Sequence, residues 1–243
     1  MKIAIEAQRL FRRKKHGMEI VALEIIKELQ KLNKEDSFFV IAKSDLDDQC
    51  ISETKNFTIK KINSSFYPFW EQIKLPQYLK KIKPDLLHCT ANTAPVFAKA
   101  RLIITIHDVI YMESVNFSGS NYQNFGNLYR KFIVPKVAKK AKIIITVSEF
   151  EKKVISQRLN ISENKIRVIY NAVNPQFKIL GMESLLLFKN KYQLPDKFIL
   201  HFGNTAPKKN TIGVLKAYSI CSSSNNGNDF TLVITDCSKD YIE

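Results

Sequence analysis

The chain has 243 residues, of which 45% are hydrophobic and 25% charged, the composition of an ordinary globular protein. No apolar run approaches the ~18 residues of a membrane span, and Glu6 interrupts the apolar stretch at the N-terminus, which argues against a signal peptide. A soluble, cytoplasmic protein is therefore expected, with room for one large α/β domain or for one and a half smaller ones.

The chain is strongly basic, with 38 Lys and Arg against 23 Asp and Glu and a net charge of +15. Nucleic acid, an anionic membrane surface and phosphorylated small molecules are the partners that such a charge favours. The sequence shows no ribonucleoprotein signature, zinc-finger spacing or helix-turn-helix pattern, so nucleic acid is not expected. Lysine-rich helix faces that are merely solvated are the alternative explanation.

The four cysteines, Cys50, Cys89, Cys221 and Cys237, lie far apart and without metal-ligand spacing. This pattern predicts free thiols in a reducing compartment and no metal site.

The chain opens with a predicted strand at residues 2–6, a basic loop at 9–17 and a helix at 18–32. Apolar residues recur at helical spacing in this helix, and Glu19 lies near the positive end of its dipole. A glycine-containing loop before a helix N-terminus offers free backbone N–H groups to an anion. The alternative is that the loop is only a connection.

Further strands are predicted at residues 38–42, 57–62 and 84–89. The aromatic-rich stretch 64–70 leads into a helix at 71–82, in which Pro76 should cause a break or kink. These aromatic side chains suit a core, an acceptor cleft or a surface that touches lipid, and a core position is favoured.

The stretch around which the chain is organised is the apolar run 102–106, which ends in His107 and Asp108. Such a β-branched run is typical of a strand buried on both faces of a parallel sheet. Ligands bind beyond the carboxyl ends of parallel strands, so this His-Asp pair is a candidate site. The alternative is that Asp108 begins a turn and His107 is a structural histidine.

The next elements continue the alternation of helices and strands. A mobile loop is expected at residues 112–126, because it is rich in Ser, Asn and Gly. A basic helix at 127–141 precedes a buried strand at 142–147. A capping box at 148–151 then opens a helix to about residue 159, and a last strand follows at 165–170.

This alternation predicts an α/β fold, a Rossmann-like parallel sheet with helices on both faces. The carboxyl ends of its strands should then meet at one edge. Glu6, His88, His107, Asp108 and Ser148 are all expected there.

A second unit is predicted to begin near Pro195. It has a strand at 197–202, a loop at 203–210, a helix at 211–221 and a strand at 230–236. This is one βαβ unit of a second Rossmann-like domain, and it is too short to bury a core by itself.

Five motifs stand in a fixed order along the chain: Pro84-Asp-Leu-Leu-His88, Thr105-Ile-His-Asp108, Ile145-Thr-Val-Ser-Glu-Phe-Glu-Lys152, Val168-Ile-Tyr-Asn-Ala-Val-Asn174 and Phe202-Gly-Asn-Thr-Ala-Pro-Lys-Lys-Asn210. Several are individually common, but their ordered combination is specific and resembles the family-four retaining glycosyltransferases. The resemblance implies the two-Rossmann glycosyltransferase B architecture. Residues 1–180 would be the acceptor-side domain and residues 190–243 the incomplete start of the nucleotide-sugar domain.

The same resemblance implies transfer of a sugar from a nucleotide-diphosphate donor to a glycan or lipid-linked acceptor, with no cofactor and no metal required. By position, His107 matches the histidine near the transferred sugar, and Gly17 matches the loop that approaches the donor phosphates. Gly203, Lys208 and Lys209 match the donor side, where fixed cations stabilise the departing diphosphate. His88, Asp108 and Ser148 fall on the acceptor side. A solvated loop is the alternative for the two lysines.

Two departures from the family bear on activity. The first loop has one glycine, in His16-Gly17-Met18, where many members have two, and the chain ends before the region of the family's paired glutamates. The chain alone is therefore expected to transfer no sugar. The alternative is a non-catalytic basic module that binds an acceptor, a partner subunit or an anionic membrane. The lysines at 136, 139, 140 and 142 are the expected peripheral contact with the inner face of a membrane.

Overall fold

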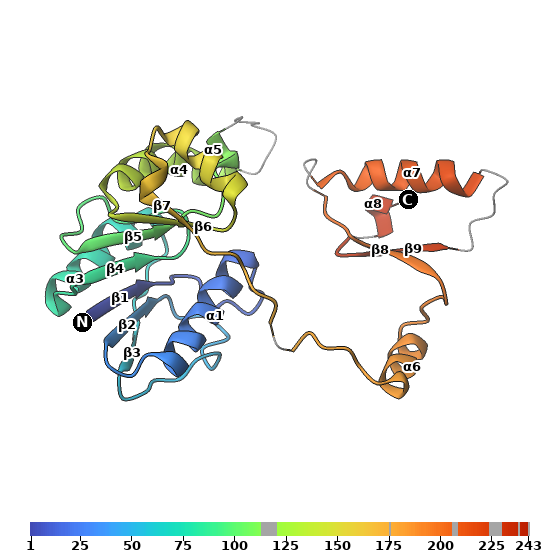
Figure 1. Ribbon diagram of the computed structural model, residues 1–243, viewed down its shortest axis with the longest axis horizontal. Coiled ribbons are helices and arrows are strands. Elements are labelled where there is room, and N and C mark those ends of the chain that lie inside the picture. The colour runs from blue at the N-terminus through green and yellow to red at the C-terminus, as the bar shows by residue number, and fades with distance from the viewer. Residues whose placement is uncertain (113–120, 175, 206–208, 224–229, 238, 243) are drawn as a thin grey trace. The chain divides into compact units, whose positions relative to one another are not determined.

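The structure is a computed structural model that describes residues 1–112, 121–174, 176–205, 209–223, 230–237 and 239–242 (Figure 1). It divides into two compact units, Met1–Asn174, called unit 1, and Pro175–Glu243, called unit 2. Each unit is described by itself.

Unit 1 contains a seven-stranded parallel sheet with the strand order β3-β2-β1-β4-β5-β6-β7. The strands are β1 (Lys2–Glu6), β2 (Ser37–Ala42), β3 (Phe57–Lys61), β4 (Leu86–Cys89), β5 (Arg101–Thr105), β6 (Ile143–Thr146) and β7 (Ile166–Val168). All seven strands predicted for this part of the chain are confirmed, with ends that differ by a few residues. The strands could be predicted because they are β-branched and apolar runs, which suit a sheet covered on both faces.

Helices cover both faces of this sheet, as predicted (Figure 1). They are α1 (Gly17–Leu32), α2 (Tyr67–Phe69), α3 (Leu75–Ile82), α4 (Asn121–Lys140) and α5 (Glu149–Leu159), with a π-helix, η1, at Trp70–Lys74 and 3₁₀ turns η2 (Ile110–Met112) and η3 (Glu163–Lys165). Side chains alternate between the faces of a strand. Ile5 and Phe38 therefore pack with Ile26 of α1 in one core, whereas Leu102 and Ile104 pack with α3, α4 and α5 in the other.

The helical segment from Tyr67 to Ile82 changes type at Pro76. Proline lacks an N–H and is tolerated in the first turn of a helix, and here it lies at the start of α3. The preceding turn is widened into η1. The predicted break is therefore a change of helix type. The segment begins at Tyr67 rather than at residue 71, and it buries two consecutive residues, Trp70 and Glu71.

Two expectations for the middle of the chain need correction. α4 begins at Asn121, so residues 121–126 are helical rather than part of a loop; residues 113–120 of the expected loop lie outside the described residues. The aromatic stretch is only partly core. Trp70 is fully buried, but Phe66 and Phe69 are half exposed at 51% and 46%.

Unit 2 contains the predicted βαβ pattern. Its elements are α6 (Met182–Lys191), β8 (Phe198–Phe202), α7 (Thr211–Ser223), β9 (Thr231–Thr235) and α8 (Lys239–Ile242). β8 and β9 pair in parallel, with Leu200 opposite Val233. Helix α6 was not predicted, because the run Leu185-Leu-Leu-Phe188 lacks the spacing of an amphipathic helix, and all four side chains are at least 44% exposed.

Candidate functional site

The carboxyl edge of the unit 1 sheet brings together side chains from the ends of β1, β4 and β5. Glu6 ends β1, Thr90 follows β4, and His107 follows β5. The Thr90 hydroxyl donates to the Glu6 carbonyl (2.9 Å), and the Thr90 carbonyl accepts from His107 Nε2 (3.1 Å). The strand order that places β1, β4 and β5 side by side thus produces a continuous polar edge, called here the edge site.

His107 is held in one protonation form at this edge. A carbonyl oxygen only accepts, so the contact with Thr90 places a proton on Nε2. Burial lowers the pKa of His107, and the ring is therefore neutral near pH 7, with Nδ1 as its acceptor. The backbone N–H of His107 donates to Asn92 Oδ1 (2.7 Å). A neutral imidazole with an acceptor nitrogen suits a contact with a hydroxyl group.

Asp108 combines a backbone role with a half-buried carboxylate. Its Oδ1 accepts from the Ile110 N–H (3.3 Å), at the start of the 3₁₀ turn η2, and its carbonyl accepts from the Asn92 amide (3.4 Å). The contact with the Ile110 N–H supports the alternative that Asp108 begins a turn. Asp108 also lies directly beside His107.

His88 lies one residue before the end of β4. Its Nε2 is 2.9 Å from the Thr105 hydroxyl of β5, and burial, with a smaller effect of His107, lowers its pKa to about 4. The ring is neutral and paired within the sheet. His88 therefore borders the edge site and contributes to the packing beneath it.

Gly17 begins α1 on an open surface. A Cβ at this position would meet nothing within 4 Å. The neighbouring Glu19 carboxylate accepts from the His16 N–H (2.8 Å) and lies 3.9 Å from Arg9 and 3.6 Å from Arg12. The basic loop is thus partly neutralised by a buried acid, and the start of α1 remains accessible.

Ser148 acts as the N-cap of α5. Its hydroxyl accepts from the Glu151 N–H at 3.1 Å, as a capping residue does. Ser148 follows β6 at the carboxyl edge, but no described hydrogen bond joins it to Thr90, His88 or His107.

The donor-side residues lie in unit 2. Gly203 is buried at the end of β8, where a Cβ would approach the Cys237 sulfur at 2.5 Å and the Thr235 carbonyl at 2.7 Å. Its role in this unit is close packing against β9. Lys209 is exposed, and Lys208 lies outside the described residues.

The sequence reasoning missed a buried acidic cluster beside the edge site. Glu71 is fully buried, and its carboxyl group contacts Tyr67, Gln72, Thr93 and Tyr129. One feature of the sequence points to this cluster. Glu71 directly follows Trp70 and lies on the helix face that periodicity assigns to the core.

Glu6 has a role beyond ending a strand. Its Oε1 accepts from the Gln8 N–H (2.9 Å), and Oε2 is buried with no hydrogen-bond partner among the described residues. Burial, together with the nearby Glu71, raises the pKa of Glu6 to about 8. Glu6 is therefore a neutral acid at pH 7 and can donate a proton to a hydrogen bond.

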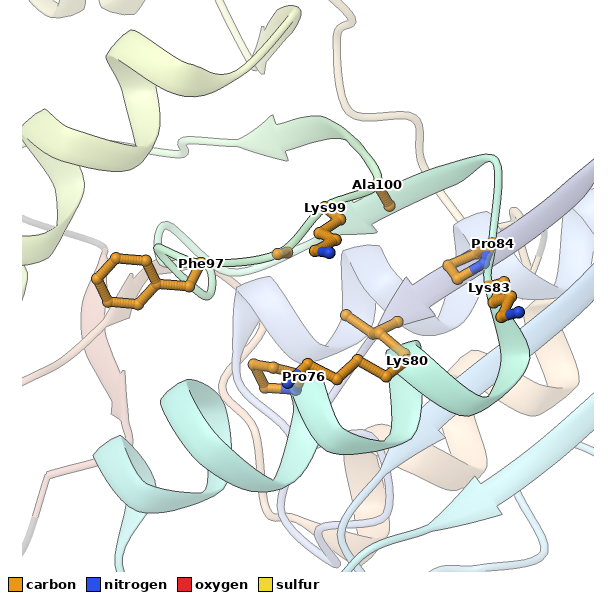
Figure 2. Close-up of a pocket in the computed structure, with 9 residues that line it drawn as sticks. Pro76, Lys80, Lys83, Pro84, Phe97, Lys99 and Ala100 are labelled. Carbon is orange, nitrogen blue, oxygen red and sulfur yellow. The ribbon is translucent and has the colours of Figure 1, made fainter.

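A hollow of about 350 Å³ opens elsewhere on unit 1, between α3 and the turn before β5 (Figure 2). It contains none of the predicted site residues. Its lining combines apolar groups with three lysines, and consists of Pro76, Leu79, Lys80, Lys83, Pro84, Phe97, Ala98, Lys99 and Ala100.

Among the described residues, no three His, Cys, Asp or Glu side chains gather as a group that could hold a metal ion. None of the described helices combines the length and the apolar character needed to cross a membrane.

The family profile described as Glycosyltransferase Family 4 matches residues 15–177, which is most of unit 1. The chain belongs to this family. The match includes the start of α1, the Glu71 cluster and the His107–Asp108 corner. The predicted family is thereby confirmed.

Similar proteins include two bacterial glycosyltransferases. An N-acetylgalactosamine-N,N'-diacetylbacillosaminyl-diphospho-undecaprenol 4-alpha-N-acetylgalactosaminyltransferase of Campylobacter jejuni is 30% identical over 124 residues, which cover 50% of this chain and 30% of that protein. The O-antigen chain mannosyltransferase RfbU of Salmonella typhimurium is 27% identical over 161 residues, which cover 66% of this chain and 39% of that protein. The matches therefore span well under half the length of these relatives.

Solved structures share the fold. The crystal structure of HepE from Anabaena in complex with UDP has a TM-score of 0.63 at 17% identity, over 96% of this chain and 60% of HepE. At this identity the likeness concerns the fold alone. It agrees with the predicted α/β, two-Rossmann architecture.

Proposed function

We propose that the chain is part of a glycosyltransferase that moves a sugar from a nucleotide-diphosphate donor to a glycan or lipid-linked acceptor. Family membership supports the reaction class. HepE binds UDP, and the Campylobacter relative is named for a diphospho-undecaprenol acceptor, which supports the proposed types of donor and acceptor. In this proposal unit 1 is the acceptor-side domain, and the reaction uses protein cations rather than a cofactor.

The observation that carries the proposal is the state of His107. His107 follows β5 at the carboxyl edge of the sheet, where ligands bind in open parallel sheets. Its proton is fixed on Nε2 by Thr90, so Nδ1 can accept a hydrogen bond from a sugar hydroxyl. Glu6, with its raised pKa, can supply a donor at the same edge.

Saturation-transfer NMR tests this role. The 243-residue chain is mixed with a panel of mono- and disaccharides linked through diphosphate to a short polyprenyl chain. We expect transfer of saturation to sugar protons of at least one member, and its loss in His107→Ala. Lys31→Ala is the control, because Lys31 is exposed in the last turn of α1, away from the segment beside Gly17. Equal signals in His107→Ala, with the fold retained, would remove His107 from the site.

We also propose that the 243-residue chain transfers no sugar by itself. Stabilising a departing diphosphate requires preorganised cations in a water-poor site. Lys209 is exposed on a unit whose sheet has two described strands, so it provides a cation but not a preorganised one. Incubation with a panel of nucleotide sugars is the measurement, and transfer or donor hydrolysis above that of a boiled sample would contradict the proposal.

We propose further that unit 1 contacts an anionic membrane through the surface around the hollow of Figure 2. Phe97 is 84% exposed there, and Lys80, Lys83 and Lys99 line the same hollow. Lys140, of the basic cluster at the end of α4, donates to the Val96 and Ala98 carbonyls (both 2.6 Å) and fixes the turn that carries Phe97. An exposed aromatic ring among lysines suits an interface of acyl chains and anionic headgroups.

Vesicle co-sedimentation tests the membrane contact. Binding is expected with vesicles rich in phosphatidylglycerol and not with phosphatidylcholine alone. Phe97→Ser should weaken it several-fold, whereas Phe202→Ser, which alters a ring 73% exposed in unit 2, should not. Binding that is equal on neutral vesicles, or that is insensitive to salt, would contradict an electrostatic contact with anionic lipid.

A further inference from the structure

The Glu71 carboxyl group is fully buried and lies at the centre of a polar cluster. Oε1 contacts the hydroxyls of Tyr67 (2.6 Å) and Thr93 (2.5 Å), and Oε2 contacts the Gln72 amide (2.9 Å) and the Tyr129 hydroxyl. Its partners belong to α2, η1, α4 and the loop after β4. Buried polar networks of this kind fix a single arrangement of the segments that they join.

The cluster also indicates the protonation form of Glu71. The Tyr67 and Thr93 hydroxyls lie 2.6 Å apart, so two hydroxyl protons serve three oxygen–oxygen contacts. A proton on the Glu71 carboxyl group completes the set. Burial raises the pKa of Glu71, and this shift also favours the protonated carboxyl group.

A short path leads from this cluster to His107. Thr93 is the neighbour of Asn92, whose backbone has a positive φ of 63°. Asn92 donates its N–H to the Thr105 carbonyl (2.9 Å) and accepts from the His107 N–H (2.7 Å). Two residues earlier, the Thr90 carbonyl accepts from the His107 ring.

The other end of the same loop is held by Gln72, the neighbour of Glu71. Gln72 Nε2 donates to the Ala94 carbonyl (3.1 Å), and Gln72 Oε1 accepts from the Val96 N–H (2.9 Å). The loop 90–96 is therefore attached to η1 by hydrogen bonds at three residues, Thr93, Ala94 and Val96. A loop fixed in this way can hold an αL residue such as Asn92, which is otherwise strained.

A second path leads to the start of α1. The Arg9 guanidinium carbon lies 5.8 Å from the centroid of the Tyr67 ring, and Arg9 also pairs with Glu19 at 3.9 Å. Glu19 in turn accepts from the His16 N–H beside Gly17. The cluster is thus connected both to the loop that holds His107 and, through Arg9 and Glu19, to the start of α1.

We propose that Glu71 is a positioning residue of the edge site, which fixes the loop 90–96 and through it the ring orientation and tautomer of His107. The inference rests on the proposed role of His107 in that site. Glu71 contacts none of the reacting groups itself. Its contribution is to keep the Thr90 carbonyl where it selects the Nε2–H form.

The test is long-range ¹H–¹⁵N NMR of the imidazole nitrogens in the full 243-residue chain, which has four histidines. The signals of His107 are assigned by their loss in His107→Asn. In the parent chain we expect a single Nε2–H tautomer, and in Glu71→Leu a mixture of the two tautomers. Glu71→Gln keeps an acceptor oxygen and a donor group, the amide NH2, on a neutral side chain, so it should retain the parent spectrum.

Unchanged His107 signals in Glu71→Leu, or a parent chain without the Nε2–H tautomer, would overturn the proposal. If Glu71→Leu fails to fold, Thr93→Val and Tyr129→Phe decide, because each removes one hydroxyl from the same carboxyl group. Thr93→Val lies on the path to His107 and should change its signals more than Tyr129→Phe does. Changes in the His107 signals that are equal in the two variants, or absent from both, would contradict the positioning role of Glu71. No substrate is used, so the outcome is independent of saturation transfer, which judges the proposed function.

Discussion

Units 1 and 2 use the same βαβ pattern and differ in how much of it is buried. In unit 1 the parallel sheet has helices on both faces, and residues such as Leu87, Ile104 and Ile144 are fully buried. In unit 2, Gly203 and Thr211 are the only described residues classed as buried, and Phe202 on β8 is 73% exposed. Secondary structure of the right kind thus forms in both, but a core is present only where several strands share it.

The largest expected effect comes from separating the units after Asn174. Residues 1–174 should unfold cooperatively at the same temperature as the whole chain, whereas residues 175–243 should show no cooperative transition. Trp70, the single tryptophan, reports unit 1 by fluorescence, and circular dichroism reports both. A sharp transition in residues 175–243 would show that the described surface of unit 2 understates its stability.

A matched pair of leucines measures the same difference residue by residue. Leu87 is 0% exposed in the middle of β4, and Leu200 is 48% exposed in the middle of β8. Leu87→Ala should cost about 2–5 kcal/mol of unfolding free energy, which lowers the melting temperature of unit 1 by roughly 4–20 °C at about 2–4 °C per kcal/mol.

Leu200→Ala is the control and should leave the Trp70 transition within about 1 °C, because exposed substitutions cost little. Equal shifts in the two variants would mean that β8 contributes to the cooperative core. Thermal melts followed by Trp70 fluorescence separate these outcomes.

The fold of unit 1 follows from local sequence more closely than its site does. Runs such as residues 102–106 predict strands because their β-branched side chains suit two covered faces. Residues 121–126 were expected in a loop because Asn and Gly have low helix propensity, yet packing of the remainder of α4 extends the helix through them.

The His107–Asp108 corner could be predicted because it directly follows a recognisable strand. The Nε2–H tautomer and the Glu71 cluster could not, since they depend on Thr90, Thr93 and Tyr129, which meet only after folding. The core position favoured for the aromatic stretch is confirmed at Trp70, but a π-turn such as η1 has no spacing rule in the sequence, so the inward position of the adjacent Glu71 was missed.

The difference between the units should also appear in the pH dependence of stability. Among the described residues, the groups whose pKa is shifted mainly by burial all belong to unit 1. The pKa of Glu6, for example, is raised to about 8. Native Glu6 keeps its proton up to that pH, whereas the unfolded chain loses it near 4.5. The unfolded state therefore binds fewer protons in between, and stability falls as the pH rises.

His88 has the opposite effect at lower pH. Its native pKa of about 4 lies below the ordinary 6.5, so the unfolded state binds more protons between these values and stability rises with pH. The two effects offset each other up to about pH 6.5. Between about 6.5 and 8 the Glu6 effect remains.

Glu6→Gln should therefore reduce the loss of stability between about pH 6.5 and pH 8, by an amount on the order of 1–2 kcal/mol. Urea denaturation at several pH values, followed by Trp70 fluorescence, measures it. Asp196→Asn in unit 2 is the control, since Asp196 is exposed and pairs with Lys189. A slope that is the same in Glu6→Gln as in the parent chain would assign the pH dependence to other groups.

The smallest expected effect concerns helix N-caps in the two units. Ser148 caps α5 with a hydrogen bond to the Glu151 N–H, whereas Gly181 precedes α6 with no side-chain cap. Ser148→Ala should cost about 1 kcal/mol and lower the melting temperature of unit 1 by about 2–4 °C. Gly181→Ser adds a cap where a Cβ meets nothing within 4 Å, and it should add a few tenths of a kcal/mol to α6 alone.

Because α6 packs no buried residue, that local gain should leave the Trp70 transition unchanged and appear only as a small increase in helical circular dichroism. A Gly181→Ser variant that raises the melting temperature of unit 1 would show that α6 is coupled to the unit 1 core. A Ser148→Ala variant without effect on melting would instead leave Ser148 free for a role at the carboxyl edge, where its strand ends beside β5.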